Sequence, residues 1–525
     1  MKPGKVNGFL RYQVMLERQI RQGFPAASAR GMSHLMDSLS AIRPVLEGID
    51  FNSPSFSGIK ASEFKFPGRG MSDPQEVIDH IIGLFNGLPN WAHPLTQKNL
   101  MPPTTSVSVV TAFLTALFNP DICSPEFSGR LIEEAEKKAV SVLSRIVGYD
   151  PRVSYGFFTY GGTFGIERGI RLSLDKVFPY RAKTGHMEGV KIVSSESAHF
   201  SVKSAAEDLG LGSDNVIRIR SNKEGEMSIL DLEDKCREML NHGEKIACIV
   251  ATIGTTDTFG LDNIAGISRL RDDLASKYHL NYPISIHADA AVAWAWGFFR
   301  DYDFKANPLQ FPAETLKALR KITRKLDSLG LADTIDVNPH KYGYVPIPSS
   351  FLLFKENGAT LAPLKRSPEE MPQLHNVGPK HPGAYTMETT RYAGGVLGTL
   401  ANLMFFGREG YQAMLGRIVE MGIRFRKKLS YIKGIRVINR RGVGGGTIFY
   451  FRTPGKTVAE QNNLNQRIYD SLNGNEGDQA INLSTSFTRD GVLVLKSLIM
   501  SPFVSSEDID KACDLIVRAV RQANG

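Results

Sequence analysis

Two short stretches decide the fold of this chain: Ile286-His287-Ala288-Asp289-Ala290-Ala291 and Asn338-Pro339-His340-Lys341. Each follows an apolar segment that is expected to be a strand. Strands and helices are expected to alternate along this part of the chain. The expected strands are 190–193, 216–219, 246–252, 284–287 and 334–337, and the expected helices between them are 201–209, 230–240, 264–278 and 316–329. This alternation predicts an α/β fold with a mostly parallel sheet and helices on both faces. The carboxyl ends of parallel strands bind ligands in such folds, so Asp289 and Lys341 should meet there.

Asp289 and Lys341 carry complementary chemistry. A lysine amine can bind an aldehyde covalently, and a carboxylate can keep a pyridine nitrogen protonated. Catalysis by pyridoxal 5'-phosphate (PLP) requires both functions. Lys341 lies in an aromatic turn with no other charge before Lys355, so we expect burial to lower its pKa. The plainer interpretation of Asp289 is a turn or helix cap. The small Ala290 and Ala291 that follow it would leave room for a flat ring.

Three further positions are candidates for the same site. Gly161, Gly162 and Thr163 stand between an aromatic strand and a helix expected at 166–174, where free backbone N–H groups favour a phosphate. His199 stands at a strand-to-helix turn, from which its ring can stack on a cofactor. Thr256 follows the strand at 246–252, and its hydroxyl can either reach the cofactor or cap the turn.

Taken together, these segments resemble the group II PLP-dependent amino-acid decarboxylases, a branch of the fold-type-I enzymes. The resemblance runs from about residue 95 to the C-terminus. The motifs that carry it are Tyr160-Gly161-Gly162-Thr163, Ala198-His199-Phe200-Ser201-Val202-Lys203, Ala251-Thr252-Ile253-Gly254-Thr255-Thr256, His287-Ala288-Asp289-Ala290-Ala291 and Asn338-Pro339-His340-Lys341.

The resemblance implies a seven-stranded type of central sheet, a role for each site residue and a homodimer with shared active sites. Lys341 would bind the cofactor covalently, and Asp289 would pair with its pyridine nitrogen. His199 and Ala291 would lie against the two faces of the ring, and Thr256 would approach the phenolic oxygen. The phosphate would be held by Gly161, Gly162, Thr163, Asn338 and His340. The segment Leu100-Met101-Pro102-Pro103-Thr104 would line the substrate pocket, with Pro103 and Thr104 as the candidate substrate-binding residues. The segment Thr389-Thr390-Arg391 would approach the phosphate.

The expected activity is α-decarboxylation of an L-amino acid. The segments at 340–346 and 383–388 resemble bacterial tyrosine decarboxylases, so an aromatic substrate is the leading hypothesis. The Lys341-Tyr342-Gly343-Tyr344 turn also resembles sphingosine-phosphate lyases. Carbon–carbon cleavage and an acidic substrate are the alternatives, and a non-catalytic scaffold is the rival from another class. The proton donor is expected on a mobile loop at 366–384 or just after it, with His375 and Tyr385 as candidates.

Composition favours an ordinary globular chain. The 525 residues carry 63 basic and 54 acidic side chains, a net charge of +9, with 42% hydrophobic residues. The densest basic run, Arg424-Phe425-Arg426-Lys427-Lys428, is expected at a helix end, where cations suit the helix dipole, and we predict no nucleic-acid partner. Cys123, Cys236, Cys248 and Cys513 have no metal-ligand spacing and are expected to be reduced core thiols.

The chain is expected to divide into three parts. These are a helical and irregular N-terminal segment at 1–105, a large PLP-binding α/β domain at 106–365, and a loop with a small α+β domain at 366–525. No stretch is apolar over enough residues to span a bilayer, and the N-terminus has no apolar core of a signal peptide. We therefore expect a cytoplasmic protein with no metal ion.

Overall fold

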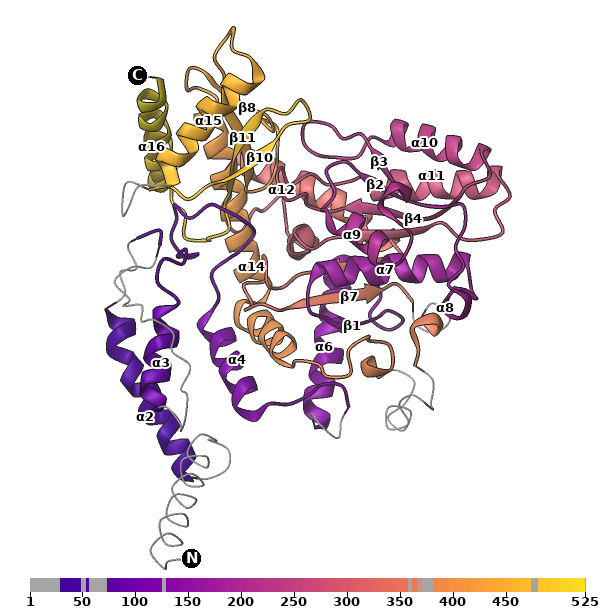
Figure 1. Cartoon of the computed structure of the whole chain (residues 1–525), viewed down its shortest axis with the longest axis horizontal. Coiled ribbons are helices and arrows are strands. Elements are labelled where there is room, and N and C mark those ends of the chain that lie inside the picture. Colours follow the sequence, from indigo (N-terminus) through magenta and orange to yellow (C-terminus); the bar gives the residue numbers. More distant parts are fainter. Residues whose placement is uncertain are drawn as a thin grey trace, which may run out of the picture.

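The computed structural model describes residues 29–48, 53–55, 73–124, 129–356, 361–366, 369, 381–473 and 480–524. Its larger part is a central sheet between layers of helices, and its smaller part holds a second sheet with the C-terminal helices (Figure 1). The predicted α/β architecture is confirmed.

The central sheet has seven strands in the order β1-β7-β6-β5-β4-β2-β3. Their bounds are β1 Tyr155–Thr159, β2 Val190–Ser195, β3 Val216–Ile219, β4 Lys245–Thr252, β5 Ser285–Asp289, β6 Thr334–Val337 and β7 Ser350–Phe354. Only β7 runs antiparallel to its neighbours in this sheet. The predicted mostly parallel sheet is therefore confirmed.

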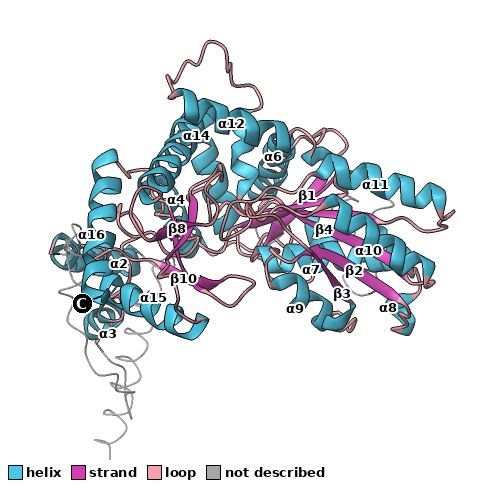
Figure 2. Cartoon of the chain, turned by 90° about the horizontal axis from the view of Figure 1, so that it is seen from above, coloured by secondary structure: helices cyan, strands magenta, loops and turns pink. Residues whose placement is uncertain are grey.

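Helices cover both faces of this sheet (Figure 2). They are α6 Arg130–Val147, α7 Gly162–Val177, α8 Arg181–Thr184, α9 Ser201–Asp208, α10 Ile229–Asn241, α11 Ile264–Lys277 and α12 Ala313–Leu326. Helix α7 crosses beneath the middle strands at close range, because a Cβ atom on Gly169 would come within 2.3 Å of His287 Nδ1. A residue larger than glycine there would push the helix off the sheet.

The smaller sheet is antiparallel, in the order β10-β11-β9-β8. It comprises β8 Ile435–Val437, β9 Gly446–Phe451, β10 Ser484–Phe487 and β11 Leu493–Leu498, with α15 Val458–Asn473 and α16 Ser506–Asn524. The long helix α14, Gly394–Leu429, joins the two parts and breaks at Gly407, whose φ of 55° and ψ of −161° are non-helical. The break divides α14 into two helical segments.

The N-terminal helices are α2 Ala29–Glu47, α3 Pro74–Gly83 and α4 Ser106–Phe118, and α4 packs against α14. The segment before α4 extends the small sheet, since Gln97 N–H donates to the Asn482 carbonyl at 2.8 Å and Leu498 N–H donates to the Gln97 carbonyl at 2.7 Å. The first segment of the chain thus wraps the last domain.

Two elements differ from what the sequence predicts. Ser124-Pro125-Glu126 predicts a helix start, but α6 begins at Arg130, and Gly129 occupies its N-cap position without a side-chain hydrogen bond. Residues 125–128 lie outside the described residues. Strand β10 was not predicted, because its sequence Ser-Thr-Ser-Phe is polar and it pairs only with β11, at the edge of the sheet.

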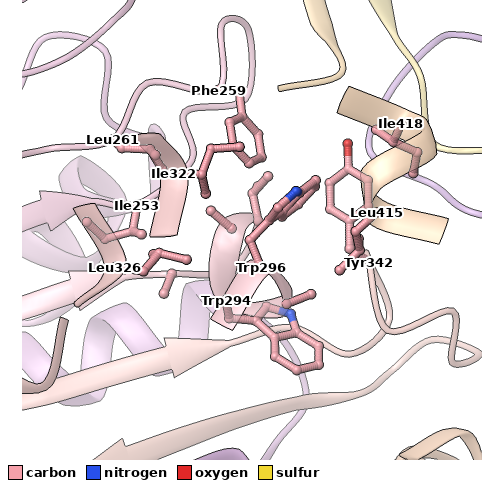
Figure 3. Packing of buried hydrophobic residues seen from close by; sticks show 14 of the residues in the cluster. Ile253, Phe259, Leu261, Trp294, Trp296, Ile322, Leu326, Tyr342, Leu415 and Ile418 are labelled. Carbon is pink, nitrogen blue, oxygen red and sulfur yellow. The ribbon is translucent and has the colours of Figure 1, made fainter. Parts of the chain in front are cut away.

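An aromatic cluster fills the core behind the lysine turn (Figure 3). The Trp296 ring meets Tyr342 edge-on at 4.8 Å and Phe259 edge-on at 4.6 Å between ring centroids. All three side chains are buried. Because Tyr342 follows Lys341 directly, this packing fixes the backbone that carries the lysine.

All four cysteines are buried and free, as predicted. Burial raises the pKa of every one of these thiols, to about 12 for Cys236, Cys248 and Cys513. Within the described ranges, no helix has the length and apolarity needed to cross a bilayer.

A buried ion pair ties three segments together. Arg391 Nη1 lies 3.0 Å from Glu136 Oε2, and the guanidinium also donates to the Phe158 carbonyl at 3.2 Å. Glu136 Oε1 in turn accepts the Phe158 N–H at 2.8 Å. Both charged side chains are 1% exposed. Helix α6, strand β1 and the segment before α14 therefore meet at one charge pair.

We expect Glu136→Ala to lower the free energy of unfolding by about 3–5 kcal/mol, because it leaves the Arg391 charge buried without a partner. Glu136→Gln combined with Arg391→Met should recover part of this loss. The matched control is Asp150→Ala, which breaks an exposed pair with Arg152 and should leave stability nearly unchanged. Urea unfolding measures all three, and equal effects of Glu136→Ala and Asp150→Ala would contradict the assignment.

Candidate active site

A cavity of about 590 Å³ lies at the carboxyl ends of β4, β5 and β6. Every residue predicted to bind the cofactor lines it: Gly161, Gly162, Thr163, His199, Thr256, Asp289, Ala291, Asn338, His340 and Lys341. They come from five separate loops along the chain, and the fold brings them together.

Asp289 is the last residue of β5 and is 7% exposed. Its Oδ1 accepts the Ala291 N–H at 3.2 Å, which holds the carboxylate at the strand end. Strand β5 pairs in parallel with β6, which directs the following Asn338–Lys341 turn to the same edge. The two predicted catalytic residues therefore face one cavity.

The lysine turn is tightly bonded. Lys341 N–H donates to the Asn338 carbonyl at 2.9 Å, and Tyr344 N–H donates to the Lys341 carbonyl at 3.1 Å. Tyr344 has a positive φ of 60°, an uncommon conformation for a bulky residue. Two features compensate for that conformation: the Tyr344 ring is buried, and its hydroxyl donates a hydrogen bond to the Met500 carbonyl at 3.3 Å.

Burial lowers the pKa of Lys341, as the sequence predicted, and the charges of Asp289 and Asp336 oppose this effect only in part. A lowered pKa makes the neutral, nucleophilic amine available nearer to neutral pH. The site thus prepares Lys341 to react with a carbonyl group.

A second carboxyl group lies beside Asp289. Asp336 on β6 is its Cα partner across the strand pair, and it lies 3.2 Å from His287 Nε2 with neither side chain exposed. Burial, and then the Asp289 charge, raise the pKa of Asp336 well above its ordinary value, while burial lowers that of His287 to about 4. Burial therefore favours the neutral form of both groups. The sequence analysis did not single out this pair. The available signal was Asp336 itself, a charged residue inside the short apolar strand expected at 334–337.

His199 has a fixed ring. Ser201 N–H donates to His199 Nδ1 at 3.3 Å, and Ser201 Oγ lies 2.7 Å from the same atom. This arrangement assigns the proton of the neutral ring to Nε2. Burial lowers the pKa of His199, so a neutral, flat imidazole borders the cavity.

The glycine turn provides an anion site at one end of the cavity. Helix α7 begins at Gly162, so its first backbone N–H groups lack partners within the helix. A Cβ atom on Gly162 would come within 2.7 Å of Asn338 Nδ2, so only glycine allows this approach. Asn338 Oδ1 is buried and has no hydrogen-bond partner in the described part of the chain. The free N–H groups at the start of α7 fit a phosphate, whereas Asn338 Oδ1 is an acceptor and would need a donor.

His340 is held by the strand that follows it. Its Nδ1 lies 2.6 Å from the Ser349 carbonyl, to which it donates, and its N–H donates to the same carbonyl at 3.1 Å. Burial, and then the Lys341 charge, lower the pKa of His340 to about 4. The neutral ring closes the phosphate end of the cavity.

Apolar residues that sequence reasoning passed over also border the cavity. Ile166, Val292, Ile347 and Pro348 line it, together with the predicted Leu100 and Met101. Tyr160 lines it too, and its hydroxyl accepts the Tyr392 N–H at 2.9 Å and lies 3.2 Å from the Thr390 carbonyl. The position of Tyr160 directly before the two glycines was the available signal.

Some predicted residues lie elsewhere in this chain. Pro103 and Thr104 do not line the cavity, because the segment turns away after Met101 and caps α4 through Thr105. Tyr385 packs edge-on against Tyr155 at 5.5 Å, in an apolar cluster beside β1 and β7. Arg391 is used in the buried pair with Glu136. His375 lies outside the described residues.

Residues 179–305 match the model of the pyridoxal-dependent decarboxylase conserved domain. The chain carries a pyridoxal-dependent decarboxylase domain. The match includes His199, Thr256, Asp289 and Ala291 and ends before Lys341. It identifies PLP as the cofactor of this decarboxylase, in agreement with the chemistry of the cavity.

Solved structures share the fold. One is the glutamate decarboxylase domain of diaminobutyrate-pyruvate transaminase and L-2,4-diaminobutyrate decarboxylase from Vibrio parahaemolyticus, at 19% identity over 96% of this chain and 99% of that chain, with a TM-score of 0.74. Mouse CSAD matches at 15% identity over 94% and 99%, with a TM-score of 0.78. Oryza sativa TDC with PLP and tryptamine matches at 15% identity over 94% and 97%, with a TM-score of 0.75. At such identities the likeness establishes the fold alone.

We expect Lys341→Ala to remove the visible absorption of covalently bound PLP, because the only amine lining the described cavity is lost. The matched control is Lys355→Ala, which changes the next lysine along the chain, an exposed residue beyond β7. Far-ultraviolet circular dichroism should show both variants folded. A yellow Lys341→Ala protein with a wild-type spectrum would contradict the assignment.

The rate at which cofactor-free protein takes up PLP should rise with pH and then reach a plateau. The midpoint of this rise should lie below 10.5, the ordinary pKa of a lysine. The sign follows from burial, which favours the neutral amine that reacts. Asp289→Asn removes a charge that raises the Lys341 pKa, so it should move this midpoint to lower pH. Stopped-flow absorbance measures both, and a midpoint at or above 10.5 in the wild type would contradict the prediction.

Proposed function

We propose that this protein catalyses the α-decarboxylation of an L-amino acid to CO₂ and an amine, with an aromatic, tyrosine-like substrate, and that it works as a homodimer. The observation that carries the proposal is the convergence of Lys341, Asp289 and His199 on one cavity beside the glycine turn.

PLP, when bound, supplies an electron sink for the pair of electrons released when a bond at Cα breaks. The Asp289 carboxylate would hold a proton on the ring nitrogen. The neutral His199 ring and Ala291 would border the cofactor's two faces, and Gly161, Gly162 and Asn338 would hold its phosphate. Lys341 would anchor the cofactor through its amine.

The lining of the cavity favours an apolar substrate side chain. Leu100, Met101, Ile347 and Pro348 form an apolar wall, which would gain free energy by covering an aromatic ring. The solved structure from Oryza sativa is described with tryptamine, an aromatic amine. Both features support an aromatic substrate.

The charges near the cavity speak against an acidic substrate. No arginine is among the described residues that line it. A neighbouring hollow of about 760 Å³ shares His199 and Thr256 with it and is lined by three cations, Lys223, Arg489 and Lys496. Lys496 lies 2.9 Å from Asp257 Oδ1, and Arg489 lies 4.0 Å from Glu196 Oε2. These two cations already have carboxylate partners, and Lys223 is exposed to solvent.

A panel of substrates tests the proposal. L-Tyrosine, L-tryptophan and L-phenylalanine should release CO₂ with kcat/KM at least about tenfold above L-glutamate, because a carboxylate facing the apolar wall loses hydration without a cationic partner. Labelled CO₂ release and amine detection measure this ratio.

The same panel separates the rivals. Aldehyde and phosphoethanolamine from a phosphorylated amino alcohol, without CO₂, would replace the proposal with carbon–carbon cleavage. Preference for L-glutamate would retain decarboxylation but refute the aromatic substrate. A folded protein that binds PLP and releases neither product would refute enzymatic function.

A further inference from the structure

A second large hollow lies between α12, the C-terminal half of α14 and the loop 440–443. Its volume is about 1160 Å³, and none of the residues that line it also lines the cofactor cavity. Helices α12 and α14, which form two of its walls, lie side by side (Figure 2). We call this hollow the basic groove, after the side chains described next.

Cations dominate the lining of the basic groove. Two of the five lining cations of α12 are already bonded, because Arg320 donates to the Phe304 carbonyl at 3.2 Å and Lys325 pairs with Glu226 at 3.3 Å. The other three repeat along the helix, and two more cations stand on the loop opposite: Lys317, Lys321, Arg324, Arg440 and Arg441. All five are exposed, and none has an ion pair with a carboxylate of the described chain. The lining contains a single carboxylate, Glu314, which pairs with Lys427 at 3.2 Å. Like charges held this close repel unless an anion joins them.

A buried arginine forms the floor of the groove. Arg426 is 2% exposed, and its Nη1 donates to the carbonyls of Gly444 and Gly446, both at 2.8 Å. Its Nη2 is buried and has no hydrogen-bond partner among the described atoms. Burial lowers the pKa of this guanidinium to about 10, with no carboxylate nearby to offset the effect. A buried, uncompensated cation with an unused donor is suited to an anionic ligand.

The size and rim of the groove indicate what kind of anion fits. Five free cations around one hollow match several linked phosphates better than a single one. They stand on two facing walls of a hollow, α12 and the loop at 440–441, which favours a small ligand over a nucleic acid. Tyr431 lines the groove and is 77% exposed, so its ring is free to stack on a ligand.

From these contacts, we propose that the basic groove binds the polyphosphate chain of a small molecule, at a site separate from the PLP cavity. The chain can come from an inorganic polyphosphate or from a nucleoside triphosphate, whose base would stack on Tyr431. The sequence run Arg424–Lys428 supplies two of the lining cations, Arg426 and Lys427.

Calorimetric titration of the full-length protein with PLP bound tests this site. Inorganic tripolyphosphate and ATP should each bind once per chain, and binding should weaken as NaCl rises. Lys321→Gln combined with Arg324→Gln should lower affinity at least about tenfold, because two charge-assisted contacts are lost. The matched control is Lys183→Gln with Lys277→Gln, two exposed lysines on α8 and α11, which should leave affinity unchanged.

Further variants sharpen the result. Arg440→Gln with Arg441→Gln should reproduce the loss from the opposite wall, and these exposed positions avoid the folding risk of changing Arg426. If the ligand is a nucleotide, Tyr431→Ala should lower the affinity for ATP but not the affinity for tripolyphosphate. If the polyphosphate chain alone is recognised, Tyr431→Ala should change neither affinity. The absorption spectrum of bound PLP should stay unchanged throughout, which separates this groove from the cofactor phosphate site.

The proposal is overturned if neither ligand binds saturably, or if the control variant loses as much affinity as the groove variant. It is also overturned if a 20-nucleotide single strand binds the groove more tightly than ATP and loses that binding in the groove variant, because the occupant would then be a nucleic acid.

Discussion

The parallel pairing of β5 with β6 is the constraint on which the site depends. Asp289 stands opposite Asp336 in this pair, so the chain leaves both strands at one edge of the sheet. The lysine turn begins only two residues later. A shift of one residue in this register would turn Asp289 into the apolar layer and carry Lys341 away from the cavity. The acid and the amine meet because backbone hydrogen bonds align them.

Burial then sets the protonation states of the groups around that edge. It lowers the pKa of Lys341, His199, His340 and His287, and it raises that of Asp336. Opposing charges at Lys341, His199, His287 and Asp336 have a smaller effect than burial, and the Lys341 charge lowers the pKa of His340 further. The outcome is a site with neutral rings and a reactive amine. The Asp289 carboxyl group stands in this site at the place where a cofactor nitrogen would be held.

Much of this arrangement could be predicted from the sequence, because residues at the ends of parallel strands meet by topology alone. His199, Thr256, Asp289 and Lys341 all follow strands that their apolar patterns indicated. Tyr385 is different: whether a loop tyrosine reaches a cavity depends on its packing, and here it packs edge-on against Tyr155. The basic groove was equally hidden, since its cations come from α12, α14 and a loop far apart in the chain. The same run at 424–428 looked like an ordinary helix end, and only the tertiary fold shows that Arg426 is buried.

The burial of all four cysteines gives the chain an internal reporter. With their thiols enclosed and their pKa values raised, these side chains are poor nucleophiles while the fold is intact. Alkylating reagents should therefore pass over the native molecule and label it only when it opens. Because Cys248 stands in the central sheet and Cys513 in the last helix, the order of their labelling would tell which part of the molecule opens first.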